Sequence, residues 1–214
     1  MEQIIKKILV KTRINVITGL HIGASKESVE IGGIDCPVIK IATRENQPYI
    51  PGSSIKGKMR CLLEQTLGAV RVGDNQSVNN LFGYSRENKP SKLIVRDAYL
   101  TKESVDRLKE CSSLDMPFTE NKYENTIDRV KGVAEHPRQT ERVPAGAEFA
   151  LEMIINVWED DNEKTLLDML ENGLRLIEND YLGGSGSRGY GQVKFGELIT
   201  TSLSQDNNWG ENGN

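Results

Sequence analysis

The chain has 214 residues, 37% of them hydrophobic, which is enough for the core of one domain with insertions or of two small domains. Its formal net charge of −4 and its pI of about 5.4 exclude binding to nucleic acid through bulk positive charge, so such a site would have to be a local basic patch. Cysteines at positions 36, 61 and 111 form neither a zinc pattern nor a disulfide framework, and no apolar run approaches the ~18 residues of a membrane span. We therefore expect a cytoplasmic protein without a membrane partner.

The first element expected along the chain is a strand. Residues 8–16 alternate apolar and polar side chains, which is typical of a half-buried strand, and the pattern ends at Gly19. His21 follows between glycines, where it is either a turn residue or a polar contact to a ligand. Asp35 lies between a Gly-Gly pair and a proline, just before a short apolar strand at 38–41. An aspartate in such a place is usually a turn former, and a catalytic carboxylate is the alternative.

A helix is expected after Pro51. Apolar residues recur there at helical spacing, namely Ile55, Met59, Leu62, Leu63 and Leu67. Ser53 or Ser54 is the expected N-cap. Lys56 and Arg60 lie in the first turns, where free N–H groups and basic side chains can bind a phosphate. The alternative is a solvated face. Basic residues at a helix start oppose the dipole, so an anion is expected nearby. The stretch also resembles a nucleotide-binding P-loop, but Met59 replaces the Ser or Thr that would hold magnesium, which excludes nucleotide hydrolysis.

The middle of the chain is more polar. Residues 70–92 are expected to be irregular around a local anchor at 81–83, residues 93–100 to form a strand, and residues 101–110 a short helix capped by Thr101. Two extended runs at 124–130 and 138–143 then predict a protruding hairpin. Its basic side chains are Lys122, Arg129, Lys131, His136, Arg138 and Arg142. A protrusion this polar is either an interaction arm or a mobile loop, and we favour the arm.

The last part of the chain repeats a strand and a helix. Residues 149–157 alternate apolar and polar side chains more clearly than any other stretch. A helix follows, capped by one of the residues 160–162, and its apolar stripe is Leu166, Leu167, Leu170, Leu174 and Ile177. A final strand is expected from Val193, and the polar tail from Thr201 is expected to be disordered.

Between that helix and the final strand lies a glycine-rich loop, residues 182–191. Five glycines fall within the nine positions from 183 to 191, which allows close approach to a ligand and exposes backbone N–H groups to an anion. Arg188 could bind a phosphate there, and Tyr190 could stack on a base. The loop matches a dinucleotide-binding fingerprint literally, but a helix precedes it and a strand follows it, so we reject that interpretation.

The order of elements is strand, helix, strand, hairpin, strand, helix, strand. This order resembles the α+β, ferredoxin-like plan with a large insertion, in which both helices cover one face of the sheet. RNA-recognition modules share the plan, but the aromatic pair that such modules carry on the sheet is not evident here. Any RNA would therefore bind through the loops.

Three stretches together resemble a known family. They are Ile50–Arg60 (IPGSSIKGKMR), Glu141–Phe149 (ERVPAGAEF) and Gly183–Gly191 (GGSGSRGYG). The chain is similar to the RAMP superfamily of CRISPR-associated proteins, and most similar to the repeated backbone subunit of type III-A Csm effector complexes. The resemblance implies a single RAMP domain over residues 1–200, with insertions at about 69–92 and 101–123. It also implies a thumb hairpin at about 124–143 and a disordered tail at 201–214.

The resemblance also implies a function. Copies of the family member stack as a filament along CRISPR RNA, beside other Csm subunits, and each copy cuts the paired single-stranded target RNA once. The cutting residue is an aspartate in the loop after the first strand, and Asp35 stands in the matching place. Its carboxylate would bind a divalent ion, magnesium by expectation, or help deprotonate a ribose 2′-hydroxyl. A non-catalytic scaffold is the alternative. A ribonuclease that processes the guide precursor is disfavoured. Family members of that kind tend to use histidine as acid and base, and His21 and His136 are the only histidines here.

The resemblance also gives candidates for RNA binding. Those expected to contact the guide backbone are His21, Ser53, Ser54, Lys56, Arg60, Gly186, Ser187 and Arg188. Those expected on the thumb are Arg129, Arg138 and Arg142. Asp97, Glu124 and Glu141 could orient these arginines or bind a neighbouring copy. Phosphate contacts of this kind position the RNA without reading its sequence, which base pairing with the guide would read.

Overall fold

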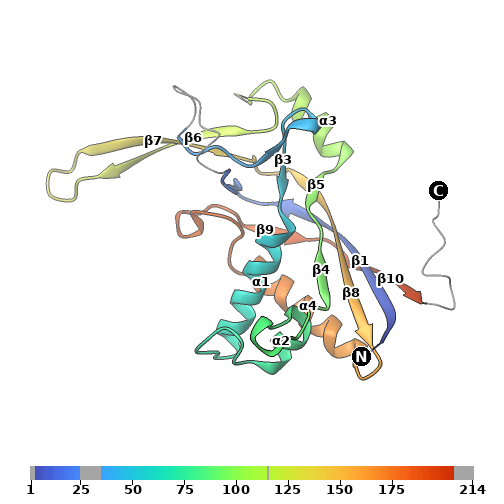
Figure 1. The fold of residues 1–214 in the computed structure, drawn as a ribbon. Coiled ribbons are helices and arrows are strands. Elements are labelled where there is room, and N and C mark those ends of the chain that lie inside the picture. The colour runs from blue at the N-terminus through green and yellow to red at the C-terminus, as the bar shows by residue number, and fades with distance from the viewer. Residues whose placement is uncertain (1–2, 25–34, 115, 205–214) are drawn as a thin grey trace.

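The computed structural model describes residues 3–24, 35–114 and 116–204 (Figure 1). The centre of the fold is one antiparallel sheet with strand order β10-β1-β8-β5-β3-β2. Strand β4 also pairs with β8, and β9 also pairs with β1. The two central strands are β1 (Ile4–Val16) and β8 (Glu148–Trp158). Their register places Val10 opposite Met153, and both side chains are fully buried. The alternating patterns thus predicted the centre of the sheet correctly.

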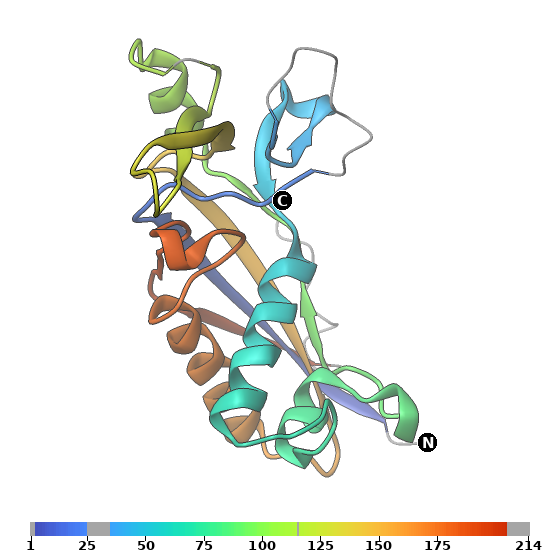
Figure 2. The ribbon, with the colours of Figure 1, turned by 90° about the vertical axis from the view of Figure 1, so that its left-hand side faces the viewer.

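Two helices cover one face of this sheet, α1 (Gly52–Thr66) and α4 (Glu163–Glu178). They lie side by side in front of β1 and β8 (Figure 2). The approach is close because Gly173 has no side chain: a Cβ built there would lie 2.2 Å from Cγ of Met59. The order β1, α1, β4 and β5, β8, α4, β9 is that of a ferredoxin-like fold, so the predicted α+β class is confirmed.

The helix caps agree with the prediction at α4 but not at α1. The side chain of Asn162 accepts a hydrogen bond from Thr165 N and caps α4. The prediction of Ser53 or Ser54 as the cap of α1 was wrong, because the helix already begins at Gly52. Its first N–H group donates to Asp97 Oδ1 at 2.8 Å, so the anion expected near this basic helix start comes from a distant loop.

The single strand expected at 93–100 is divided into β4 (Leu93–Val95) and β5 (Ala98–Leu100), both paired with β8. Val95 lies opposite Met153 and Tyr99 opposite Ala150, so four steps along this segment match three steps along β8. The extra residue produces a bulge at 96–97, which turns Asp97 toward the start of α1.

Several short elements complete the body. Strands β2 (Lys40–Ile41) and β3 (Gln47–Ile50) extend the sheet at one edge, and β9 (Val193–Phe195) and β10 (Ile199–Ser204) pair with β1. The expectation of a disordered tail was therefore wrong for residues 201–204, which are held in the backbone ladder with β1 despite their polar side chains. The rest of that expected tail, 205–214, lies outside the described residues.

Two further helices lie at the ends of the body. Helix α2 (Gln76–Phe82) falls in the stretch expected to be irregular, where Asn75 caps it and Val78 and Leu81 anchor it in the core. Helix α3 (Lys102–Glu110) has Thr101 as its cap, as predicted. Short 3-10 turns occur at Ala42–Arg44, Ser85–Glu87 and Gly186–Arg188.

The predicted hairpin is present and projects far from the body (Figure 1). Its strands, β6 (Glu120–Ile127) and β7 (Ala134–Arg142), pair with each other as a separate two-stranded sheet. Strand β6 begins at Glu120 and β7 at Ala134, each four residues before the predicted starts at 124 and 138. The hairpin has no core of its own, and Tyr123, Ile127 and Val130 are exposed along it.

Candidate functional site

The base of the hairpin receives the segment that contains Asp35. The carboxylate of Asp35 is exposed, and its Oδ2 accepts a hydrogen bond from the backbone N–H of Gln139 on β7 at 3.1 Å. The next residue, Cys36, forms a parallel bridge with Thr140, and its carbonyl accepts from Glu141 N at 3.0 Å. Asp35 is therefore fixed to β7, although it lies 104 residues away in sequence. Nothing in the sequence singles out Gln139 for this role, because it acts through its backbone.

Antiparallel pairing closes the other side of this segment. Ala24 N donates to Pro37 O at 3.0 Å, and Ile39 N donates to Ile22 O at 2.8 Å. These bonds join the chain before and after residues 25–34, which lie outside the described part. The backbone of residues 36–39 is thus held between β7 on one side and residues 22–24 on the other.

The buried carboxylate of Glu141 also binds this segment. Glu141 is 1% exposed, and its side chain accepts hydrogen bonds from Val38 N at 2.9 Å and from Thr119 Oγ1 at 2.7 Å. Lys40 Nζ lies 2.5 Å from it and supplies the counter-charge. The roles considered for Glu141 from the sequence, orienting an arginine or binding a neighbouring copy, are not the role it has here.

His21 lies between the hairpin and the glycine-rich loop. Its Nδ1 is 2.8 Å from the carbonyl oxygen of Glu141, and its own carbonyl accepts from Gly184 N at 2.8 Å. Gly183 has φ of +79°, and a Cβ there would lie 2.3 Å from the His21 carbonyl oxygen. The loop needs a glycine at this point because any side chain would collide with the backbone of residue 21. His21 thus has a structural contact on one ring nitrogen, beside any contact it makes with a ligand.

The exposed part of the loop is Ser187, Arg188 and Gly189, whereas Gly186 is half-buried against the ring of Tyr181. Arg188 lies 3.4 Å from Glu124 of β6, so Glu124 orients an arginine, as considered from the sequence. With Arg138 of β7, these two residues line a hollow of about 280 Å³. Two of the predicted RNA-binding arginines are therefore brought together, with Ser187 exposed beside them.

Tyr190 is not available to stack on a base, because it is 1% exposed. Its ring is covered instead by Lys122 of β6, with Nζ 4.4 Å from the ring centre, and by Arg142 of β7, with Cζ 4.7 Å away. Arg142 also lies 2.5 Å from Glu120. The predicted thumb arginine Arg142 is thus largely committed to contacts within the chain.

The carboxylate of Glu124 and the phenol of Tyr190 influence each other. Burial raises the pKa of Tyr190, and the neighbouring Glu124 carboxylate raises it further. Burial alone would also raise the pKa of Glu124, but the Tyr190 phenol, the Lys122 ammonium and the Arg188 guanidinium together lower it. Glu124 is therefore held as an anion among basic side chains at the junction of hairpin and loop.

Lys56 and Arg60 are not part of this cluster. Lys56 Nζ donates to Ser91 Oγ and to the carbonyl of Leu93, both at 2.7 Å, and burial, followed by the charge of Arg60, lowers its pKa. Arg60 donates to Glu64, to the carbonyl of Gly83 and to Asn79 Oδ1. Lys56 thus connects α1 to β4, and Arg60 connects α1 to α2. Of the other predicted contacts, Ser53 is exposed and Ser54 half-buried at the start of α1, and Arg129 is exposed in the hairpin turn.

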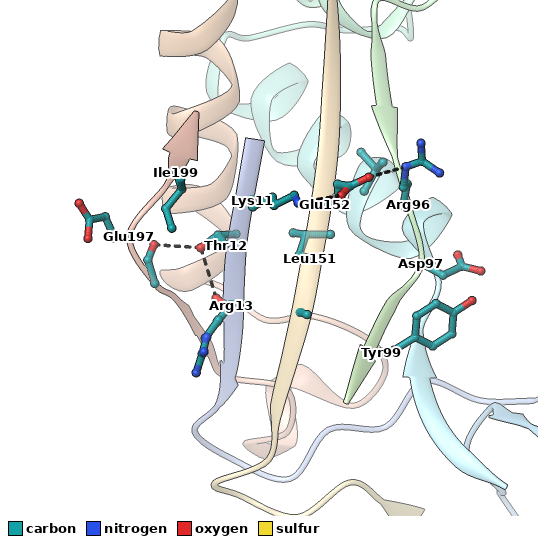
Figure 3. Close-up of a pocket in the computed structure, with 13 residues that line it drawn as sticks. Lys11, Thr12, Arg13, Arg96, Asp97, Tyr99, Leu151, Glu152, Glu197 and Ile199 are labelled. Carbon is teal, nitrogen blue, oxygen red and sulfur yellow. Dashed lines mark hydrogen bonds and ion pairs between the residues drawn. The ribbon is translucent and has the colours of Figure 1, made fainter. Parts of the chain in front are cut away.

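A larger hollow lies elsewhere, on the sheet face opposite the helices (Figure 3). It measures about 910 Å³, and Ala150 and Tyr99 are among the residues that line it. Its basic side chains are paired with carboxylates, Arg96 with Glu152 at 2.8 Å and Lys11 with Glu152 at 3.7 Å. None of the residues predicted to bind RNA or to cut it lines this hollow, so we place the candidate site at the hairpin base.

Potential metal ligands do not cluster around Asp35 in the described part of the chain. Among the described residues, no three His, Cys, Asp or Glu side chains converge to hold one. In the same part of the chain, no helix is long and apolar enough to span a membrane.

Comparison with known proteins identifies the family. The model of the RAMP superfamily matches residues 13–194. The chain belongs to the RAMP superfamily. This RAMP protein is 41% identical over 210 residues to the CRISPR system Cms endoribonuclease Csm3 of Methanothermobacter thermautotrophicus, a match that covers 89% of this chain and 84% of the relative. It is 42% identical to the Csm3 endoribonuclease of Streptococcus thermophilus, with 92% and 90% covered.

Solved structures agree with this RAMP protein in fold. It superposes on a chain of the Csm3–Csm4 subcomplex of the type III-A CRISPR-Cas interference complex with a TM-score of 0.63 and 29% identity, covering 98% of this chain and 86% of that one. A chain of the type III-B Cmr-beta complex bound to cognate target RNA gives a TM-score of 0.66 at 19% identity, covering 91% and 61%. The second likeness concerns the fold alone.

Proposed function

We propose that this RAMP protein is the repeated backbone subunit of a type III-A CRISPR ribonucleoprotein. It binds CRISPR RNA and cleaves complementary single-stranded target RNA at regular intervals, one cut per subunit. Its partners are the two RNAs, further copies of itself in a filament and other Csm subunits, in the cytoplasm. The Csm3 names of its relatives support this proposal. The observation that carries it is the attachment of the exposed Asp35 carboxylate to β7 of the projecting hairpin.

Asp35 acts on the target strand. The hairpin displaces a nucleotide of the guide–target duplex, which frees its ribose 2′-hydroxyl to line up with the adjacent phosphate. The Asp35 carboxylate helps to remove the hydroxyl proton, and the 2′-oxygen attacks phosphorus to form a 2′,3′-cyclic phosphate. The bond to the 5′-oxygen breaks, and that oxygen leaves as a hydroxyl after taking a proton from water. The hydrogen bond from Gln139 N holds the carboxylate in place for this step.

The guide backbone binds where backbone N–H groups and basic side chains meet. The surface for this comprises the exposed turn of the glycine-rich loop with Arg188, His21 and the start of α1 with Ser53 and Ser54. Arg138 and Arg129 extend it along the hairpin, and Arg142 lies at its base. Lys56 and Arg60 join it only when RNA draws them from the internal partners described above.

A divalent ion, magnesium by expectation, takes part in the reaction. Asp35 offers one carboxylate and, among the described residues, no two further ligands converge with it, so phosphate oxygens of the RNA would supply the remaining ligands. Such an ion would stabilise charge on the scissile phosphate. We expect cleavage by the assembled complex to stop on chelation and to return with added magnesium. Full cleavage in excess chelator would refute the metal requirement and leave the role of Asp35 standing.

The test compares target-RNA cleavage by the assembled complex with wild-type subunits, with Asp35→Ala and with Asp35→Asn. Asparagine keeps an oxygen that accepts from Gln139 N and removes the charge, so it separates placement from chemistry. We expect both variants to bind target normally and to lose cleavage. Asp160→Ala is the matched control, since Asp160 is also exposed but lies in the turn after β8, whose other end follows the hairpin. Retained cleavage at the same sites in Asp35→Ala would favour the scaffold alternative.

A further inference from the structure

A stack of side chains joins the hairpin to the body of the protein. Arg142 of β7 lies between two surfaces: the ring of Tyr190, with Cζ 4.7 Å from the ring centre, and the backbone of Gly19. The contact with Gly19 is so close that a Cβ there would lie 2.5 Å from both Cζ and Nε of Arg142. Lys122 of β6 lies against the same ring, so one aromatic side chain contacts both strands of the hairpin.

The tyrosine belongs to the body and not to the hairpin. It lies between Gly189, with φ of +85°, and Gly191, with φ of +72°. Gly191 N donates to Gly19 O at 3.0 Å, and its carbonyl accepts from Leu182 N at 2.9 Å. The ring and the Gly19 backbone thus form one rigid unit, against which the base of the hairpin rests.

Backbone bonds hold the base of β7, where Glu141 N donates to Cys36 O and Val143 pairs with Leu20, and the stack on Tyr190 adds a side-chain contact from both strands. Among the described strands, β6 and β7 pair with each other and join no strand of the main sheet. Asp35 is bound to β7, through Gln139 N, three residues before Arg142. A change in the angle of the hairpin would therefore move the carboxylate relative to the loop that contains Arg188.

We propose that Tyr190 is a positioning residue for cleavage: its ring, by holding Arg142 and Lys122, sets the direction of the hairpin and so places Asp35 against the target phosphate. This inference rests on the proposed function. The ring carries the effect, not the hydroxyl. The phenol oxygen is buried beside the Glu124 carboxylate and lowers its pKa. Tyr190→Phe removes this effect on Glu124 and keeps both cation contacts, whereas removing the ring abolishes them.

Three variants test the proposal in the guide-loaded complex. Tyr190→Leu removes the ring, and Tyr190→Phe keeps it. Gly19→Ala leaves both partners intact, but its methyl group occupies the place of the Arg142 guanidinium and displaces it from the ring. Tyr99→Leu is the matched control, because Tyr99 also has an arginine over its ring, Arg44 at 4.0 Å, but lies on β5, away from the hairpin.

The measurements are target affinity, single-turnover cleavage rate and cut positions. We expect Tyr190→Leu and Gly19→Ala to bind target within about threefold of wild type and to cleave at least about tenfold more slowly, since a misplacement of 1 Å can cost about 100-fold. Tyr190→Phe and Tyr99→Leu should cleave as wild type does. Combining Gly19→Ala with Tyr190→Leu should add little, because both act on one contact.

Two results would overturn the proposal. One is cleavage at the wild-type rate by Tyr190→Leu or, if that variant does not assemble, by Gly19→Ala. The other is a loss in Tyr190→Phe as large as in Tyr190→Leu, which would transfer the effect to the hydroxyl. Failure of the proposed function is a separate result, because it appears as unchanged cleavage by the Asp35→Ala complex.

Discussion

Replacing Glu141 by alanine should destabilise the fold strongly, because this carboxylate is buried and has three partners. Its removal leaves the N–H group of the buried Val38 without an acceptor, which costs about 1–3 kcal/mol. It also breaks a charged pair with Lys40, which is generally worth about 3–5 kcal/mol when both partners are buried. The Lys40 side chain is 29% exposed and can regain water, so we take about 3 kcal/mol for the whole change.

In a chain of 214 residues, about 3 kcal/mol corresponds to a fall in Tm of about 6–12 °C. Thermal denaturation followed by circular dichroism measures it directly. Glu141→Gln should fall between wild type and alanine, since its one oxygen serves three donors. Glu135→Ala on the same strand is the matched control, because its ion pair with Lys131 is 3.9 Å long and exposed. A Tm of Glu141→Ala within about 2 °C of wild type would refute the reasoning, since it would mean that the network contributes under about 1 kcal/mol.

Three further predictions concern charged side chains, namely Glu124 and Arg188 at the site and Arg60 on α1. The pKa of Glu124 is lowered in the fold, so its stabilising effect should be complete above its ordinary value of about 4.5 and be lost as the pH falls through the lowered value. The difference in Tm between wild type and Glu124→Gln should therefore shrink between pH 6 and pH 3, and a difference that grows on acidification would contradict this. Arg188→Ala should reduce the log–log salt slope of RNA binding by about one unit, and an unchanged slope would remove Arg188 from the interface. Arg60→Ala should mainly lower Tm, because Arg60 has internal partners; a slope loss of about one unit would instead assign it to a phosphate.

The long elements could be predicted from the sequence because their side-chain periods are unambiguous. Strands β1 and β8 alternate over many residues, and α1 and α4 carry regular apolar stripes that meet at Met59 and Gly173. The hairpin could be predicted for the opposite reason, since it lacks apolar side chains for a core. Short elements were missed: β3 has four residues and α2 seven, too few for a period to show.

Partners far apart in the chain could not be predicted. The cap of α1 comes from Asp97, 45 residues after Gly52, and local preference therefore favoured Ser53 or Ser54. The sequence predicts Tyr190 as an exposed ligand-binding residue in a glycine-rich loop, but in the structure Lys122 and Arg142 of the hairpin cover its ring. The site itself was placed by family resemblance, because an aspartate in a turn, such as Asp35, has no local feature that separates catalysis from turn formation.

Residues 22–24 pair with residues 37–39, so the backbone on both sides of segment 25–34 is held by described contacts. Asp35 is positioned by bonds to β7 and by the chain that follows it, and none of these described contacts depends on the number of residues between 25 and 34. The carboxylate is therefore placed by contacts made outside residues 25–34, and changing the length of that segment tests whether the described contacts are enough to keep the cutting group in place.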